Sequence, residues 1–141
     1  MTGQRTFASS VEELDMLSQR TQARVLIVDD NEVVRTALAG LIRGDRHFAV
    51  VGQATGGQAA LGAIRSTNPD LVCLDVQMDD IDGLSILEQI RDKHMNIRVV
   101  MITAQSTPHV VQSALSLGAR GFVIKPFTAE KVLRALHRAV M

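Results

Sequence analysis

Four short apolar runs in this chain each end in polar residues of the kind that phosphoryl chemistry uses. They lead into Asp29-Asp30, Asp75, Thr103 and Lys125. The runs are rich in β-branched residues and have helical patterns between them, which is typical of buried parallel strands. The carboxyl ends of parallel strands meet at one edge of an open sheet. We therefore expect three carboxylates, a hydroxyl and an ammonium to converge there.

The three carboxylates predict a bound divalent cation. Carboxylates about 5 Å apart repel by roughly 3 kcal/mol at an effective dielectric constant near 20, and one lysine cannot balance three of them. Oxygen ligands favour Mg²⁺, or alternatively Mn²⁺, over Zn²⁺. Asp75 is then a candidate nucleophile, because carboxylates form aspartyl-phosphate intermediates. Any one of these aspartates is typical of a turn or helix cap, so their joint position carries the argument.

The elements that must position these residues predict one α/β domain of five strands and five helices. A length of 141 residues favours a single domain. The second strand, near residues 48–53, ends without a charged residue, so we expect it at a sheet edge. That gives a flavodoxin-like, doubly wound parallel sheet in the order 2-1-3-4-5. Helices are expected from Gly57 to about Ser66, from Leu84 to Lys93, and after the caps Thr107 and Thr128.

The domain is expected to cover residues 24–141, preceded by a polar N-terminal extension over residues 1–23. Within the extension, Ser10 and Glu13 resemble a capping box at the start of a short helix. Two interpretations stay open for this segment. It is either a frayed tail that carries one short helix, or a helix that docks on the domain or on a partner.

Composition excludes several classes of function. Fifteen basic residues balance fifteen acidic ones, so no overall charge attracts the chain to nucleic acid or to a membrane surface. Neither a membrane-spanning apolar stretch nor a secretory signal pattern is present, so we expect a cytoplasmic protein. Cys73, the only cysteine, is expected to be a buried structural thiol. The four histidines lack metal-ligand spacing and are expected in surface or structural roles: His47, His94, His109 and His137.

Over about residues 24–140 the chain resembles the receiver domain of bacterial two-component response regulators, in particular the single-domain, chemotaxis-regulator-like members. The resemblance rests on several motifs taken together, each of which is weak alone. The matching stretches are residues 25–32, 70–78, 81–84, 100–104 and 118–127. The fold of this family is the flavodoxin-like order given above, for which a family member is a standard example.

The resemblance implies a role for each acidic residue. Asp75 matches the residue that accepts a phosphoryl group. Asp30 and Asp75 match direct Mg²⁺ ligands, and the backbone carbonyl of Gln77 matches a third. Asp29 matches the acid that holds the metal ion through water.

The resemblance also implies how the phosphoryl group is held and sensed. Thr103 and Lys125 match the residues that contact it, and Phe122 matches an aromatic switch position. The bond between Lys125 and Pro126 matches one that is usually cis. Gln77 and Gln105 flank the path of an attacking water, so they are expected to tune dephosphorylation.

The function that follows is a phosphorylation-controlled switch. A sensor histidine kinase or a phosphotransfer protein donates the phosphoryl group, and the face made by the fourth helix, fifth strand and fifth helix contacts a downstream protein or a second copy of the chain. The chain is expected to be no enzyme beyond its own phosphorylation and dephosphorylation, and to lack a DNA-binding domain. A phosphorelay intermediate and a degenerate receiver are alternatives. A phosphatase of the haloacid-dehalogenase type is disfavoured, because Gln77 stands where that chemistry needs an acid.

One position departs from the family pattern. Asp79 stands where the family usually has a proline, so the loop over residues 79–82 loses a fixed φ angle and gains negative charge. This leaves its conformation and the metal affinity open. The loop is not an EF-hand, because with Gly83 at the sixth position the first and last ligands would be Met78 and Gln89.

Overall fold

Five parallel strands form one sheet in the order β2-β1-β3-β4-β5. The computed structural model describes residues 22–93 and 95–141. The strands are β1 (Ala23–Val28), β2 (Phe48–Ala54), β3 (Leu71–Leu74), β4 (Arg98–Thr103) and β5 (Gly121–Ile124). The helices are α2 (Glu32–Arg43), α3 (Gly57–Thr67), α4 (Gly83–Asp92), α5 (Pro108–Ser116) and α6 (Ala129–Val140). The predicted flavodoxin-like order is confirmed, with β2 at an edge.

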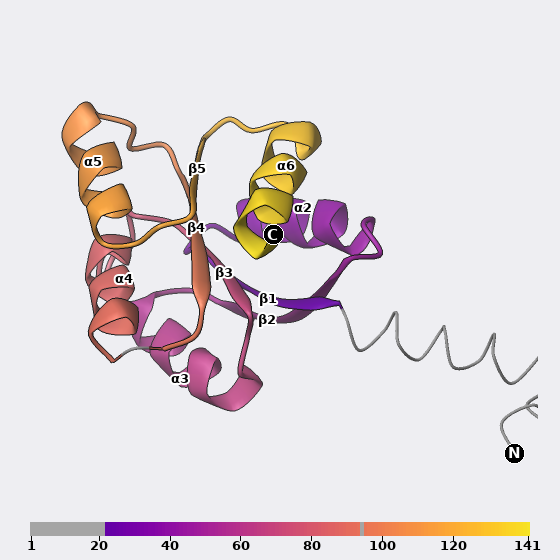
Figure 1. Cartoon of the computed structure of the whole chain (residues 1–141), viewed down its shortest axis with the longest axis horizontal. Coiled ribbons are helices and arrows are strands. Elements are labelled where there is room, and N and C mark those ends of the chain that lie inside the picture. The colour runs from indigo at the N-terminus through magenta and orange to yellow at the C-terminus, as the bar shows by residue number, and fades with distance from the viewer. Residues whose placement is uncertain (1–21, 94) are drawn as a thin grey trace, which may run out of the picture.

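Helices cover both faces of the sheet. Figure 1 shows α2 and α6 on one side and α3, α4 and α5 on the other. Within β1, Leu26 and Val28 pack under α3 and α4, whereas Val25 and Ile27 pack under α2 and α6. Because successive side chains of a strand point to opposite faces, a strand buried on both sides needs an unbroken apolar run. This is why the runs of β1, β3 and β4 lack polar residues until their ends, whereas β5, at the second edge of the sheet, is only partly buried.

The predicted helix starts are confirmed at their caps. The Thr107 hydroxyl accepts a hydrogen bond from the Val110 N–H, and the Thr128 hydroxyl accepts one from the Lys131 N–H. α4 begins one residue earlier than predicted, at Gly83, because the Asp82 carboxylate caps it.

The first strand begins slightly before the expected domain boundary. β1 begins at Ala23, whose N–H donates to the His47 carbonyl, so the sheet starts one residue before the expected boundary at 24. The short helix predicted near Ser10 lies outside the described residues. Within the described residues, no helix is long and apolar enough to span a membrane.

Cys73 lies in the middle of β3 and is fully buried. Burial raises the pKa of its thiol to about 12, because the apolar core disfavours the charged thiolate. The expectation of a structural thiol is confirmed: a group with such a pKa stays protonated at neutral pH.

Candidate functional site

The predicted carboxylates do converge at one edge of the sheet. In the strand register Val28 pairs with Leu74, so the residues that follow them, Asp29 and Asp75, leave the sheet side by side. Oxygen atoms of Asp29, Asp30 and Asp75 all lie within 4.8 Å of one another. Asp29 and Asp75 are buried, whereas Asp30 is exposed at the rim.

Lys125 joins the two buried carboxylates. Its Nζ donates to Asp29 Oδ2 at 2.7 Å and to Asp75 Oδ2 at 3.0 Å. The position of Lys125 follows from the register, because Thr103 at the end of β4 pairs with Ile124 at the end of β5. Burial by itself disfavours the charged ammonium, but the hydrogen bonds from Lys125 to both carboxylates raise its pKa above the ordinary value.

The charge of the site is not balanced by Lys125 alone. Burial raises the pKa of Asp29, and the negative charge of Asp75 adds to this, although hydrogen bonds from Lys125 and Asn31 act in the opposite direction. The fold thus places Asp29 where its ionised form is disfavoured. A group of close carboxylates with excess negative charge fits a small divalent cation with oxygen ligands, so the donor set suits Mg²⁺.

The backbone around Asp75 is packed tightly. The Asp75 N–H donates to the Val28 carbonyl at 3.1 Å, and Asp75 Oδ1 accepts from the Gln77 N–H at 3.1 Å. Gly83, the first residue of α4, donates its N–H to the Val76 carbonyl at 2.8 Å. A Cβ atom at Gly83 would lie 2.0 Å from the Asp75 carbonyl oxygen. A glycine at position 83 therefore lets α4 start directly against the backbone of Asp75.

A cavity of about 320 Å³ opens above these side chains. Its lining residues are Asp29, Asp30, Asn31, Asp75, Gln77, Asp79, Ala104 and Lys125. Thr103 is fully buried beside this cavity, and its hydroxyl accepts from the Gln105 N–H at 3.2 Å. Phe122, on β5, lines a different cavity, with residues of α6. The structure thus gathers the acids, Lys125 and Gln77 in one cavity, while Thr103, Gln105 and Phe122 do not line it.

The loop that lacks the usual proline is held by a helix N-terminus instead. The Asp80 carboxylate accepts hydrogen bonds from the N–H groups of Gly57 and Gln58, at 2.9 and 3.0 Å, and from its neighbour Ile81. These hydrogen bonds, with that from Gln58 contributing most, lower the pKa of Asp80 to about 2. Asp80 thus binds the start of α3, and Asp79 is the loop acid that adds charge to the cavity.

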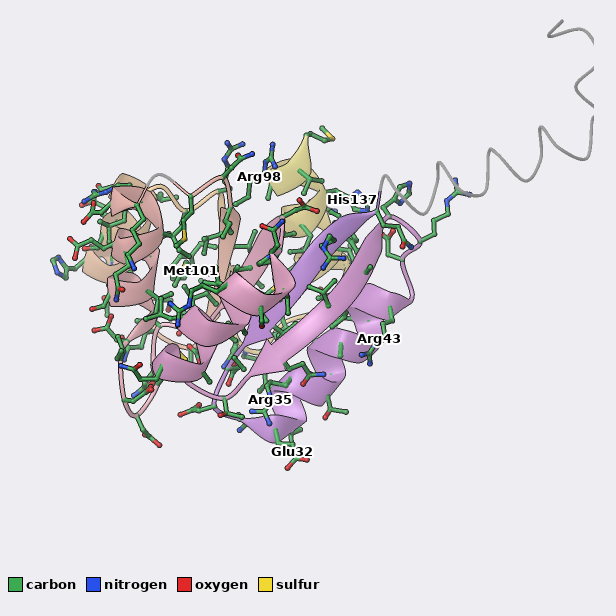
Figure 2. The ribbon with its side chains drawn as sticks, turned by 90° about the horizontal axis from the view of Figure 1, so that it is seen from below. Glu32, Arg35, Arg43, Arg98, Met101 and His137 are labelled. Carbon is green, nitrogen blue, oxygen red and sulfur yellow. The ribbon has the colours of Figure 1, made fainter. Side chains whose placement is uncertain are left out.

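The sequence interpretation missed one residue that supports the site. The Arg35 guanidinium donates to the Asp29 carbonyl oxygen at 2.7 Å. Figure 2 shows Arg35 near Glu32, at the beginning of α2. Helical side chains lean toward the N-terminus of their helix. A long basic side chain in the first turns of α2 could therefore have been predicted to reach the residues that precede the helix. The peptide bond between Lys125 and Pro126 is cis, as the resemblance implied.

Comparison with known proteins agrees with this architecture. Residues 25–137 match the family model described as the response regulator receiver domain. The chain belongs to this family. It is 38% identical over 116 residues to the chemotaxis protein CheY of Listeria monocytogenes, which covers 82% of this chain and 97% of that protein. It is 33% identical over 123 residues to the nitrate/nitrite response regulator NarL of Escherichia coli, covering 87% of this chain and 57% of that protein.

Solved structures show the same fold. A chain of the CheX–CheY–BeF3–Mg²⁺ complex from Borrelia burgdorferi has a TM-score of 0.80 and 28% identity, covering 88% of this chain and 98% of that chain. The receiver domain of a NarL regulator from Mycobacterium tuberculosis has a TM-score of 0.78 and 32% identity, with coverage of 82% and 94%. The chain is thus a CheY-like receiver domain of two-component signalling. Receiver domains generally bind Mg²⁺ at an acidic pocket and interact with histidine kinases and downstream targets.

Proposed function

We propose that this receiver domain accepts a phosphoryl group on Asp75 from the phosphohistidine of a sensor histidine kinase or a phosphotransfer protein. The observation that carries the proposal is the position of Asp75, buried at the end of β3 and facing the acidic cavity, with Lys125 bound to its carboxylate. The Lys125 ammonium, which already donates to two carboxylates, can instead donate to a phosphoryl oxygen and stabilise its negative charge.

In the proposed step, a carboxylate oxygen of Asp75 attacks the phosphorus atom of the donor. The P–N bond of the phosphohistidine breaks, and its electron pair leaves with the imidazole nitrogen, which takes up a proton. Later, water attacks the same phosphorus atom and releases inorganic phosphate, restoring the carboxylate. Both reactions change only this chain and its donor, so the protein is a self-modifying switch rather than an enzyme with free substrates.

Mg²⁺ is the cofactor that fits, with Mn²⁺ as a substitute. Asp30, Asp75 and the Gln77 carbonyl would bind it directly, and Asp29 would hold it through water. When bound, the ion neutralises negative charge on the phosphoryl group and the carboxylates. Support comes from the three close carboxylates and from the Borrelia burgdorferi relative, whose complex contains BeF3 and Mg²⁺.

The output is proposed to be a change in a protein-binding face. Thr103 would turn toward the phosphoryl group, and Phe122 would move into the space that it leaves. The face would consist of α5, β5 and α6, on which Leu115 and Ile124 already expose about half of their surface. Exposed apolar side chains next to a switch residue suit a downstream protein or a second copy of this chain. A phosphorelay intermediate would use the same site.

The test uses the full chain with acetyl phosphate and Mg²⁺, followed by intact mass measurement. We expect a gain of one phosphoryl group that chelation prevents. Asp75→Asn should abolish the gain, whereas Asp79→Asn, which changes another carboxylate lining the same cavity, should retain it. Labelling of Asp75→Asn at the wild-type rate would show that the acceptor is another residue. Absence of both phosphoryl gain and beryllofluoride binding in the presence of Mg²⁺ would indicate a degenerate receiver that only binds proteins.

A further inference from the structure

A second group of side chains of the kinds that ligate metal ions lies at the other end of the sheet. His47 Nδ1 is 2.8 Å from Asp45 Oδ1, and His137 Nε2 is 2.7 Å from Asp45 Oδ2. One donor atom from each of the three residues lies within 4.8 Å of the others. The sequence interpretation found no metal-ligand spacing among the histidines. That interpretation missed this cluster, because His137 is 92 residues from Asp45 and only the packing of α6 brings them together.

The three side chains stand on elements that the fold fixes. Asp45 and His47 lie in the turn between α2 and β2, where the Asp45 N–H donates to the Ile42 carbonyl and the Phe48 N–H donates to the Asp45 carbonyl. His137 lies on α6, with its ring centroid 4.8 Å from that of Phe48 and 5.1 Å from that of His47, both edge to face. The geometry of the cluster is therefore built by the domain rather than by a free loop.

Figure 2 places this group far from the proposed phosphorylation site. His137 lies beside the start of β1, whereas Glu32 and Arg35 lie at the beginning of α2. That end of α2 adjoins Asn31, which lines the acidic cavity. The Ala23 N–H, at the start of β1, donates to the His47 carbonyl, which confirms that the cluster borders the first residues of the sheet. A ligand bound here would not compete with Mg²⁺ for the same side chains.

We propose that Asp45, His47 and His137 bind a transition-metal ion of the Zn²⁺ type. Two imidazole nitrogens and one carboxylate oxygen form a ligand set typical of such ions, and imidazole does not suit Mg²⁺. Zn²⁺ ligands about 2.0–2.1 Å from the ion stand roughly 3.3 Å apart. The donor atoms already lie within 4.8 Å of one another, so each separation needs to change by about 1.5 Å or less. Small rotations of the two imidazoles supply this adjustment, because His47 is 59% and His137 37% exposed at the side chain.

The exposed side of the cluster provides the entry path and the remaining coordination position. Asp45, with only 14% of its side chain exposed, forms the base of the site, and the two rings form its walls. Water would complete a tetrahedral set. The ion would connect the last helix to the turn that precedes β2, so its binding would stabilise the packing of α6. The inference does not depend on the proposed phosphorylation of Asp75.

The experiment uses the full chain without a polyhistidine tag, treated with chelator and then kept in millimolar Mg²⁺ to occupy the acidic cavity. Zn²⁺ is titrated by calorimetry, and Co²⁺ serves as a spectroscopic probe. We expect one Zn²⁺ per chain, a rise in Tm with Zn²⁺, and visible Co²⁺ bands of a tetrahedral site. His47→Gln and His137→Gln should each weaken Zn²⁺ binding at least tenfold.

His109→Gln is the matched control, because His109 is an exposed histidine on α5, and it should bind Zn²⁺ like the wild type. Retained Mg²⁺ binding and circular dichroism verify that each variant is folded; His47, in an exposed turn, is the safer site if His137→Gln unfolds. Unchanged Zn²⁺ affinity in both cluster variants would overturn the proposal, since the ion would then bind elsewhere. Absence of stoichiometric Zn²⁺ binding by the wild type would also overturn it, leaving Asp45 as a hydrogen-bonded link between two imidazoles.

Discussion

The acidic cavity and the histidine cluster shift the pKa of an aspartate in opposite directions. Asp29 lies beside another carboxylate, and burial raises its pKa. Burial also acts against the charge of Asp45, but hydrogen bonds from the His47 N–H and from the side chains of His137 and His47 outweigh it and lower the pKa to about 2. The fold therefore disfavours the charged form of Asp29 and favours the charged form of Asp45.

The acidic cavity would therefore gain stability from a bound cation, whereas Asp45 is already stabilised by its hydrogen bonds to the two histidines. A bound cation would relieve the unfavourable negative charge in the acidic cavity, and functional sites commonly trade stability for activity in this way. In the histidine cluster, Asp45 already contributes to folding, and a metal ion would add to a structure that exists without it. Four predictions follow from this contrast, in order of expected size.

Gly83→Ala should disrupt the acidic cavity most strongly. Its Cβ would lie 2.0 Å from the Asp75 carbonyl oxygen, so the start of α4 and the backbone of Asp75 must move apart. We expect the free energy of unfolding to fall by about 3 kcal/mol, with loss of phosphoryl gain at Asp75. Urea denaturation and mass measurement with acetyl phosphate report both effects.

Gly62→Ala is the control, because Gly62 lies inside α3 with open space where a Cβ would stand. It should raise the stability by about 0.5–1 kcal/mol and leave phosphorylation unchanged. Equal stability of the two variants would contradict the close contact between α4 and Asp75.

Asp29→Asn should stabilise the metal-free protein while weakening Mg²⁺ binding. The substitution removes one of the buried like charges, so we expect a gain of about 1 kcal/mol at pH 7. The native pKa of Asp29 is raised, so its ionisation costs stability above that pKa, and this cost disappears as the pH falls. Denaturation in chelator at several pH values should show the advantage of the variant shrinking toward acid. A variant less stable than the wild type at pH 7 would contradict this account.

Asp45→Asn should have the opposite pH signature. The native pKa of Asp45, about 2, is below its ordinary 3.8, so its contribution to stability is fully present above about pH 4 and is lost as the pH falls toward 2. The variant should be less stable than the wild type at pH 7 and equal to it near pH 2. Denaturation in chelator across this range measures the difference. A constant difference at all pH values would show that the loss comes from packing instead.

Gln77→Ala and Gln105→Ala should have the smallest effects, confined to the lifetime of the phosphoryl group. Gln77 lines the cavity, and the backbone N–H of Gln105 donates to the Thr103 hydroxyl. The family resemblance implies that both residues flank the path of an attacking water. We expect a change of several-fold in the decay rate, below about 1 kcal/mol in the barrier, with labelling retained. Decay rates equal to the wild type in both variants would remove these residues from dephosphorylation.

Much of the acidic site followed from position along the strands. An apolar run that is buried on both faces can change to polar residues only where it leaves the sheet, which places Asp29 and Asp75 at one edge. The parallel register of β4 and β5 places Lys125 at the same edge. The contacts among them did not follow. That Lys125 bridges two carboxylates, and that Thr103 lies buried beside the cavity rather than lining it, depends on side-chain packing that spacing does not report.

The sequence by itself determined the strand order, the edge at which the acids meet and the caps that begin the helices, because these depend on local periodicity and on parallel strand geometry. Only the tertiary structure decided how α6 packs beside the turn before β2 and how Asp80 reaches the start of α3. Those contacts join segments that are far apart in the chain, and they depend on the angles at which the helices pack. The local sequence pattern does not encode these angles, so the contact between His137 and Asp45 could be recognised only in the folded domain.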